Sequence, residues 1–246
     1  MTTIFVDIGN SKTKIAFVED EVYKFVSSTF NKEFSNNQFK FLLDCNQELE
    51  GVVIASVASK EMTDSVSDLF FKNTRVMPII LKTKSEEKGL INAYERYDSL
   101  GVDRWLGMLA LSDDYENYIV ISVGTAITID VVKNKTHQGG VIVPGLNLMR
   151  KSLLDETALV RFESEEDMVQ KKSLYNTTAS AVLGGTLYMV AEFLNSFILN
   201  VKNENEMEFK VIASGGDFFK IQPLINHEVE VVFDLVIQGM IKSYFS

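Results

Sequence analysis

A carboxylate followed by a glycine turn stands near the start of the chain. Asp7 ends an apolar alternating run, Gly9, Asn10 and Ser11 follow it, and Lys14 comes next. Glycine lacks a Cβ, so backbone N–H groups at such a turn can approach phosphate oxygens. Asp7 can hold Mg²⁺, which commonly takes one or two protein carboxylates, and Lys14 can offset phosphate charge. Side-chain hydrogen bonds in an ordinary hairpin turn account for the same residues, so this alternative stays open.

A second glycine turn occurs midway along the chain, at Gly124 and Thr125. The run Val6–Ser11 overlays on Ile121–Ala126, and each run is followed by another strand-like segment. The overlay predicts that one β-hairpin opens each half of the chain, with two glycine turns offered to one ligand. Chance recurrence of a common strand–glycine–strand pattern is the alternative, as is a plain strand with exposed threonines at the second turn.

A carboxylate and a guanidinium begin a predicted helix in the sequence Gly101-Val102-Asp103-Arg104. Transfer of a phosphoryl group to an alcohol needs a carboxylate within reach of the hydroxyl and a cation near the moving charge. An Asp at a helix start with a solvated Arg is the simpler interpretation of the same pair.

Two further glycine clusters are candidate ligand contacts. Gly139–Gly145 surrounds a short apolar strand, which indicates close approach of the backbone to a ligand or to another strand. Gly215 and Gly216 follow a predicted strand at 209–213 and are candidate nucleotide contacts. A strand-to-helix turn is the alternative at the second cluster.

Several common classes of site are not indicated. Neither His137 nor His227 has a Cys, a Glu or a second His at metal-ligand spacing, which argues against zinc. The sequence has no Gly-x-Ser-x-Gly elbow, Walker loop or dinucleotide-binding glycine fingerprint. A net charge of −10 over 246 residues argues against a broad nucleic-acid surface.

The cellular compartment is predicted to be the cytoplasm. No run approaches the roughly 18 uninterrupted apolar residues that span a bilayer, and the first residues have no basic region or cleavage site. Cys45 is the only cysteine, which is typical of a reducing compartment. We therefore expect no membrane partner.

Strands that alternate with helices must position these residues, so the expected class is α/β. The first hairpin joins residues 4–6 to Lys14–Val18. The other expected strands are Val22–Ser27, Val52–Val57, Val76–Leu81, a pair from Ile119 onward and Phe209–Ala213; the expected helices are Phe34–Leu43, Asp64–Phe71, Asp103–Leu111, one after Pro144, about Ala179–Leu199 and one from about Asp234.

Taken in order, these segments resemble the type III pantothenate kinase family over essentially the whole chain. The similar stretches are Asp7–Lys14, Asn92–Trp105, Gly124–Asp130, Gly139–Gly145 and Ser214–Asp217. The resemblance implies two similar ribonuclease-H-like lobes, the duplicated fold of actin, hexokinase and acetate kinase, with the active site in the cleft between them. We expect the lobes at 1–115 and 116–246.

The resemblance also implies a reaction and a role for each matching residue. The reaction is ATP-dependent phosphorylation of pantothenate to 4'-phosphopantothenate, the first step of coenzyme A biosynthesis, with Asp103 as general base. Pantothenate would contact Tyr94, Gly101, Val102, Asp103, Arg104 and Thr178. The ATP phosphates would be held by Asp7, Ile8, Gly9, Asn10, Ser11, Lys12, Thr13, Lys14, Gly124, Thr125, Gly215 and Gly216, with Mg²⁺ at Asp7.

The family likeness further implies a homodimer and a monovalent cation, K⁺ or NH₄⁺. The helix at about Ala179–Leu199 is the candidate dimer interface, and a core helix is the alternative. Three positions depart from the family pattern: Ser122 replaces the Asp that ligates the cation, Tyr97 replaces a Pro, and Leu159-Val160-Arg161 replaces a Leu-Pro pair. Because a hydroxyl brings no charge to the cation, we expect weak or absent K⁺ dependence.

Two other functions remain as alternatives at this point. One is a kinase or phosphatase of the same superfamily that acts on a sugar or a short acid, although the stretch Asn92–Trp105 argues against it. The other is a nucleotide-binding regulatory protein without catalysis, which Ser122 allows and which the presence of Asp7, Lys14, Asp103 and Arg104 disfavours.

Overall fold

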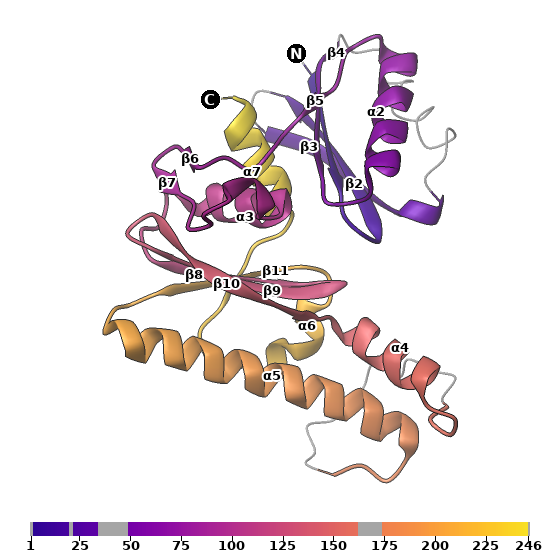
Figure 1. Ribbon diagram of the computed structural model, residues 1–246, viewed down its shortest axis with the longest axis vertical. Coiled ribbons are helices and arrows are strands. Elements are labelled where there is room, and N and C mark those ends of the chain that lie inside the picture. Colours follow the sequence, from indigo (N-terminus) through magenta and orange to yellow (C-terminus); the bar gives the residue numbers. More distant parts are fainter. Residues whose placement is uncertain (1, 20–21, 34–48, 162–173, 246) are drawn as a thin grey trace. The chain divides into compact units, whose positions relative to one another are not determined.

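The computed structural model describes residues 2–19, 22–33, 49–161 and 174–245 (Figure 1). The chain forms two compact units. Unit 1 comprises residues 1–114, 135–137 and 234–246, and unit 2 comprises residues 115–134 and 138–233. The helix expected at Phe34–Leu43 lies outside the described residues.

Unit 1 is built on a five-stranded sheet in the order β3-β2-β1-β4-β5. The first three strands are antiparallel, whereas β4 runs parallel to β1 and β5 parallel to β4. The predicted hairpin and the strands after it are confirmed, although β5 has only two residues. The bounds are β1 Thr2–Ile8, β2 Lys12–Glu19, β3 Val22–Phe30, β4 Leu49–Ser56 and β5 Ile79–Ile80.

The two faces of this sheet carry different side chains because successive residues of a strand point to opposite sides. Ile4, Val6 and Ile8 of β1 pack in one cluster with Phe70 of helix α2 (Lys60–Thr74). Phe5 lies on the other face, where its ring contacts Tyr244 at 5.7 Å between centroids. Asp7 shares that second face of β1.

Unit 2 repeats the strand order of unit 1. Its strands are β8 Tyr118–Val123, β9 Ala126–Lys133, β10 Thr136–Pro144, β11 Lys210–Ser214 and β12 Glu230–Val231, of which β10 belongs to unit 2 from Gln138 onward. They lie in the order β10-β9-β8-β11-β12, in which β8 and β9 form an antiparallel hairpin and β11 and β12 are parallel to β8. This repetition confirms the predicted duplicated α/β fold.

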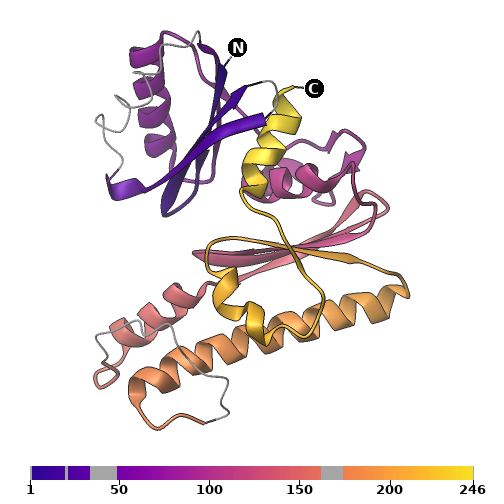
Figure 2. The ribbon, with the colours of Figure 1, turned by 180° about the vertical axis from the view of Figure 1, so that it is seen from behind.

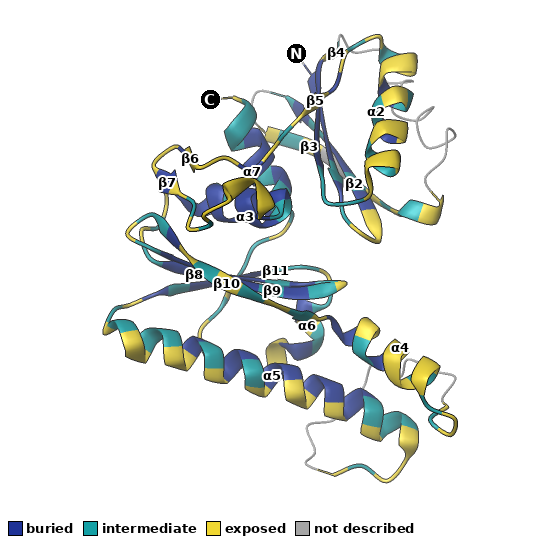
Figure 3. Ribbon diagram, in the orientation of Figure 1, coloured by how far each residue is buried: buried dark blue, intermediate teal, exposed yellow. Residues whose placement is uncertain are grey.

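The long helix α5 (Thr178–Asn205) lies along one face of the unit 2 sheet, as Figures 1 and 2 show. Leu187, Val190, Leu194 and Ile198 pack in one cluster with the inward residues of the sheet. Figure 3 shows this buried stripe and the exposed opposite side. By length and composition alone α5 is long and apolar enough to cross a membrane, but half of that stretch is buried. Packing on the sheet already accounts for its apolar character.

The remaining helices are short. Unit 2 contains α4 (Leu146–Glu156) and α6 (Phe218–Ile221), and unit 1 contains α3 (Val102–Leu111) and α7 (Leu235–Tyr244). In the described part of the chain, 3₁₀ turns occur at η1 Asn31–Glu33, η2 Tyr97–Ser99 and η3 Gln222–Leu224, and a small hairpin joins β6 (Glu86–Glu87) to β7 (Leu90–Ile91). Lys135–His137 belong to unit 1, where Thr136 pairs with Ile91.

The buried carboxylate of Glu87 fixes α3 within unit 1. It accepts hydrogen bonds from the indole N–H of Trp105 at 3.2 Å and from the hydroxyl of Ser243 at 2.8 Å. The ammonium of Lys84 also donates to it. One side chain thereby ties the β6–β7 hairpin to both α3 and α7.

Helices α3 and α7 approach each other closely at Gly239. A Cβ at this position would lie 2.0 Å from the carbonyl oxygen of Leu106, which belongs to the α3 backbone. Gly239→Ala should therefore lower the free energy of unfolding by about 1–3 kcal/mol, because backbone atoms cannot move aside as a flexible side chain can. Thermal unfolding followed by circular dichroism measures the change.

Gly185→Ala is the matched control for this prediction. Gly185 lies within α5, and a Cβ there would meet nothing within 4 Å. Alanine has a higher helix propensity than glycine, so this variant should gain up to about 1 kcal/mol. Equal melting temperatures for the two variants would contradict the close approach of α3 and α7.

Candidate active site

The β1–β2 turn of unit 1 is held in shape by Asn31. Its side-chain amide donates to the carbonyl of Gly9 at 2.9 Å, and its side-chain oxygen accepts from the Thr13 hydroxyl at 2.9 Å. The backbone N–H of Asn31 donates to the carbonyl of Ser11 at 2.9 Å. No motif marks Asn31 in the sequence, because the residue acts on the turn from 22 positions away.

The residues of this turn differ in what they can offer a ligand. Asn10, Ser11 and Lys12 are exposed, whereas the side chains of Ile8 and Thr13 are buried. Ile8 and Thr13 can therefore support a phosphate site only through the backbone and through the shape of the turn. Lys12 lies over the ring of Phe30, at 4.7 Å from its centroid.

Asp7 is the centre of a charged group within unit 1. It lies directly across the hairpin from Lys14. Its pKa is raised to about 7, chiefly because burial disfavours the charge; Lys14 opposes the rise, and the carboxylates of Asp103 and Asp234 add to it. A cation bound at Asp7 would stabilise the carboxylate form.

Lys14 is paired with Asp234, a residue that the sequence marked only as the start of the last helix. Its ammonium nitrogen lies 2.9 Å from a carboxylate oxygen of Asp234, and 35% of the Lys14 side chain stays exposed. Asp234 has a left-handed backbone with φ of 51° immediately before α7. The pair holds the lysine beside the turn while leaving it accessible to an anionic ligand.

Asp103 lies in the first turn of α3, where its carboxylate accepts from the backbone N–H of Arg104 at 2.8 Å. Gly101 leaves room for this carboxylate, since a Cβ at residue 101 would lie 2.7 Å from one of its oxygens. The dipole of α3 also favours a negative charge in the first turn. The sequence Gly-Val-Asp thus sets the position of a carboxylate at the helix start.

Arg104 and Tyr94, two of the predicted substrate contacts, are in contact with each other. The guanidinium of the buried Arg104 donates to the Tyr94 hydroxyl at 3.1 Å. On its ring face Tyr94 stacks on the imidazole of His137, with centroids 5.8 Å apart. The backbone N–H of Tyr94 donates to the side chain of Asn92 at 3.0 Å. These contacts place two polar groups of fixed orientation near the start of α3.

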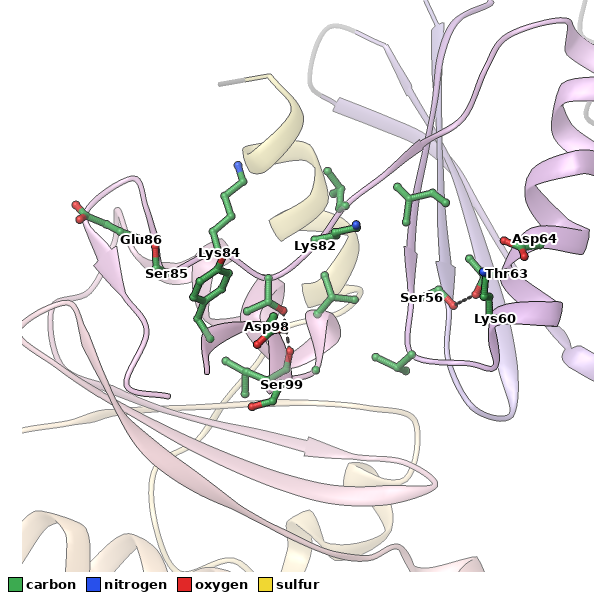
Figure 4. Close-up of a pocket in the computed structure, with 18 residues that line it drawn as sticks. Ser56, Lys60, Thr63, Asp64, Lys82, Lys84, Ser85, Glu86, Asp98 and Ser99 are labelled. Carbon is green, nitrogen blue, oxygen red and sulfur yellow. Dashed lines mark hydrogen bonds between the residues drawn. The ribbon is translucent and has the colours of Figure 1, made fainter. Parts of the chain in front are cut away.

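A cavity of about 1120 Å³ lies in unit 1, and two of the predicted substrate contacts, Gly101 and Val102, are in its wall. Figure 4 shows the charged and hydroxyl side chains that surround it. Three lysines and three acidic residues line it, so its charge is balanced. One wall carries Ser56 and Thr63, whose hydroxyls are 2.6 Å apart. The charged lining residues are Lys60, Lys82, Lys84, Asp64, Glu86 and Asp98.

Three glycine turns of unit 2 meet at the end of β8. The backbone N–H of Gly145 donates to the carbonyl of Thr125 at 2.9 Å, and a Cβ on Gly145 would lie 2.0 Å from the carbonyl oxygen of Gly124. Gly215 has a φ of +97°, and a Cβ there would lie 2.2 Å from the carbonyl oxygen of Val123. The backbones of these turns therefore pack too closely to leave space for a side chain at Gly145 or Gly215.

Ser122 belongs to a row of hydroxyls across the unit 2 sheet. It is the register partner of Thr128 on β9 and of Ser214 on β11. Directly paired residues share a face of the sheet, so the three side chains lie side by side. This row supplies oxygen atoms and no carboxylate.

The predicted site residues divide between the two units. Asp7–Lys14, Tyr94 and Gly101–Arg104 belong to unit 1, whereas Gly124, Thr125, Gly215, Gly216 and Thr178 belong to unit 2. Thr178 is exposed in the first turn of α5. Across the described residues, no three His, Cys, Asp or Glu side chains gather as a metal-ligand group. Mg²⁺ bound through one carboxylate, nucleotide phosphates and water needs no such group.

Comparisons with known proteins identify the family of the chain. The family profile of type III pantothenate kinase matches residues 3–200. The chain is 35% identical over 239 residues to a type III pantothenate kinase of Hydrogenovibrio crunogenus, covering 96% of each chain. It is 32% identical over 249 residues to one from Nitrosococcus oceani, covering 96% of this chain and 91% of the relative.

Solved structures share the fold at lower identity. A conserved protein assigned to the Baf family of transcriptional activators, from Campylobacter jejuni, has a TM-score of 0.57 at 21% identity, over 96% of this chain and 94% of that chain. The activator of 2-hydroxyisocaproyl-CoA dehydratase from Clostridium difficile, with bound ADPNP, has a TM-score of 0.56 at 13% identity, over 99% and 92%. A glucokinase from an Antarctic psychrotroph has a TM-score of 0.52 at 10% identity, over 100% and 99%.

The family profile and the two relatives each cover most of the chain, and the solved structures share its duplicated α/β fold. The chain therefore belongs to the type III pantothenate kinase family.

Proposed function

We propose that this kinase transfers the terminal phosphoryl group of ATP to the primary hydroxyl of pantothenate, with Asp103 as the general base. The position of the Asp103 carboxylate carries the proposal: Gly101 leaves space for it and the Arg104 N–H holds one of its oxygens. A carboxylate in that position can accept the proton of an alcohol while the phosphoryl group arrives from the opposite side. The product is 4'-phosphopantothenate, the first intermediate of coenzyme A biosynthesis.

We place pantothenate at the start of α3, where Gly101 and Val102, which line the cavity, precede Asp103 in the chain. The cavity next to Gly101 and Val102 exceeds the size of such a ligand, and Arg104 and Tyr94 offer polar groups with fixed orientation. We assign the recognition of polar groups on the substrate to Tyr94 and Arg104, because their mutual hydrogen bond fixes the orientation of both side chains near the start of α3. Thr178 would complete the contacts from unit 2.

The triphosphate would be held by the glycine turns. The phosphate contacts that we propose from unit 1 are the backbone of Gly9–Lys12 and the partly exposed Lys14. Those that we propose from unit 2 are Gly124, Thr125, Gly215 and Gly216. Mg²⁺, held by Asp7, would neutralise phosphate charge when it is bound. Catalysis of this kind consists mainly of positioning and electrostatic stabilisation.

The enzyme is proposed to act in the cytoplasm as a homodimer. On the outer side of α5, Tyr188, Met189 and Leu199 are each about half exposed. These side chains are our candidate for the surface that a second copy covers. Light scattering coupled to size-exclusion chromatography should give twice the monomer mass. Met189→Glu, which places a charge on the proposed dimer surface, should lower the measured mass toward that of the monomer.

The function is tested by a coupled assay for ADP release with purified protein, Mg-ATP and pantothenate. Turnover that depends on pantothenate supports the proposal. A panel of sugars and short hydroxy acids in place of pantothenate tests whether another acceptor is used. ATP binding without turnover on any acceptor would instead favour a regulatory protein.

Ser122 predicts how the reaction responds to K⁺. The row of Ser122, Thr128 and Ser214 supplies no negative charge to a monovalent cation. We expect activity to change little when K⁺ replaces Na⁺ at constant ionic strength, and Ser122→Asp to introduce a saturable activation by K⁺. Ser122→Asn, which adds no charge, is the control. Steep and saturable activation of the unmodified enzyme by K⁺, with none by Na⁺, would contradict the assignment.

A further inference from the structure

Two aromatic side chains of unit 2 form an exposed stack. Phe219 and Phe233 have ring centroids 5.8 Å apart and an angle of 24° between their planes. Phe219 is 47% exposed and Phe233 is 65% exposed. Neighbouring Phe218, by contrast, is fully buried in the core. Helix α6 thus places one phenylalanine in the core and presents the next to solvent.

Strand pairing places this stack at the same sheet edge as the glycine turns. Strands β8, β11 and β12 are parallel, so their carboxyl ends lie together. Gly124 directly follows β8, Gly215 directly follows β11, and Phe233 lies two residues after the end of β12. The backbone N–H of Val232 donates to the carbonyl of Ala213 at 2.9 Å. Val232 immediately precedes Phe233, and Ala213 lies two residues before Gly215, so this hydrogen bond holds the two segments side by side.

Parallel strands lie about 4.8 Å apart. The end of β12 therefore lies about 10 Å from the end of β8, a span that the ribose and phosphates of a nucleotide can bridge. Ligands of α/β sheets bind outside the carboxyl ends of their strands. The edge of unit 2 thus presents backbone groups for phosphates at one end and an aromatic surface at the other.

Gly216 lies on the chain between the phosphate turn and Phe219, and packing within the protein does not explain its lack of a side chain. A Cβ there would meet nothing within 4 Å, and the backbone does not adopt the left-handed conformation that favours glycine. Gly216 is also exposed. Its lack of a side chain leaves space above the chain between the turn and the aromatic pair.

We propose that Phe219 and Phe233 form the platform on which the nucleotide base of ATP stacks. The proposal rests on the proposed function, since it assumes that the glycine turns of unit 2 hold the phosphates of the same nucleotide. Every base has a π-face, so the platform favours a nucleotide over a base-free polyphosphate and discriminates weakly between adenine and guanine. The pair then determines affinity for the phosphoryl donor and does not take part in the transfer itself.

The test compares the unmodified enzyme with Phe219→Ala/Phe233→Ala. We expect the double variant to raise the KM for ATP by about 5- to 100-fold, the loss that follows from removing a base-stacking contact. The kcat at saturating ATP and the KM for pantothenate should change less than twofold. Phe233→Trp, which keeps an aromatic surface, should retain or lower the KM for ATP.

Calorimetric titration with ADP and with inorganic tripolyphosphate separates base stacking from a general loss of structure. The double variant should bind ADP more weakly and tripolyphosphate equally well. Phe71→Ala, at an aromatic residue of α2 that is 38% exposed, is the control and should change neither affinity.

Equal losses for ADP and tripolyphosphate, or a KM for ATP within twofold of the unmodified enzyme, would overturn the platform. These titrations need no acceptor. Failure of pantothenate as substrate, with the ADP result as expected, would reject the proposed reaction and leave the platform in place.

Discussion

Asp103→Asn is expected to lower kcat by about 10²–10⁴-fold while the protein stays folded, because the amide cannot accept the proton of the substrate hydroxyl. The amide keeps an oxygen that can accept from the Arg104 N–H, so the first turn of α3 should be preserved. The KM values for ATP and pantothenate should change far less than kcat. Steady-state kinetics at saturating concentrations of both substrates measure the effect.

Asp68→Asn provides the matched control. Asp68 is an exposed carboxylate on α2, and its replacement removes the same charge from the molecule. This variant should keep full activity and the melting temperature of the unmodified enzyme. Nearly full turnover by Asp103→Asn would show that Asp103 is not the base.

Asp7→Asn is expected to have opposite effects on activity and on stability. Activity should fall by about 10²–10³-fold, as for other groups that stabilise charge in a transition state. Stability in Mg²⁺-free buffer at pH 8 should rise, because the desolvated surroundings of the partly buried Asp7 disfavour a charged carboxylate and the variant has a neutral amide there.

The pH dependence of that stability follows from the pKa. Folding raises the pKa of Asp7 from 3.8 to about 7, so the folded state binds more protons than the unfolded state between these values. Stability of the unmodified enzyme therefore falls as the pH rises from about 4 to about 7, by at most about 4 kcal/mol from this group. Asp7→Asn has no titratable group at this position, so its stability lacks this dependence on pH.

Urea unfolding at pH 4, 6 and 8 with a chelator present tests this prediction. The difference between Asp7→Asn and the unmodified enzyme should be near zero at pH 4 and largest at pH 8. Asp68→Asn should show no such trend. A variant less stable than the unmodified enzyme at pH 8 would contradict the raised pKa of Asp7.

The repeated hairpin could be predicted from the sequence because it depends on local signals. Alternating apolar residues and a glycine at the same place in each copy are visible without knowledge of the fold. The helix start at Asp103 is local in the same way, since Gly101 and Arg104 lie within two positions of the carboxylate that they position.

The contacts that complete the site depend on residues far apart in the chain. Lys14 pairs with Asp234, which is 220 positions away in the sequence, and Asn31 donates a hydrogen bond to Gly9 in the β1–β2 turn, which is 22 positions away. No periodicity or spacing rule relates such residues, because they meet only when the sheet and α7 have formed. The same holds for Phe219 and Phe233, which the strand pairing of β11 and β12 brings together.

The return of α7 to unit 1 has a consequence for folding during synthesis. Residues 1–114 leave the ribosome first, yet the face of β1 that carries Phe5 and Asp7, and the side of α3 at Leu106, are covered by residues 234–246. Unit 2, whose last residue is 233, can be complete before unit 1 is. The part of the protein that is made first is thus the last to be completed, and we expect a nascent chain stalled before residue 234 to expose Phe5 and Leu106 to chaperones and proteases.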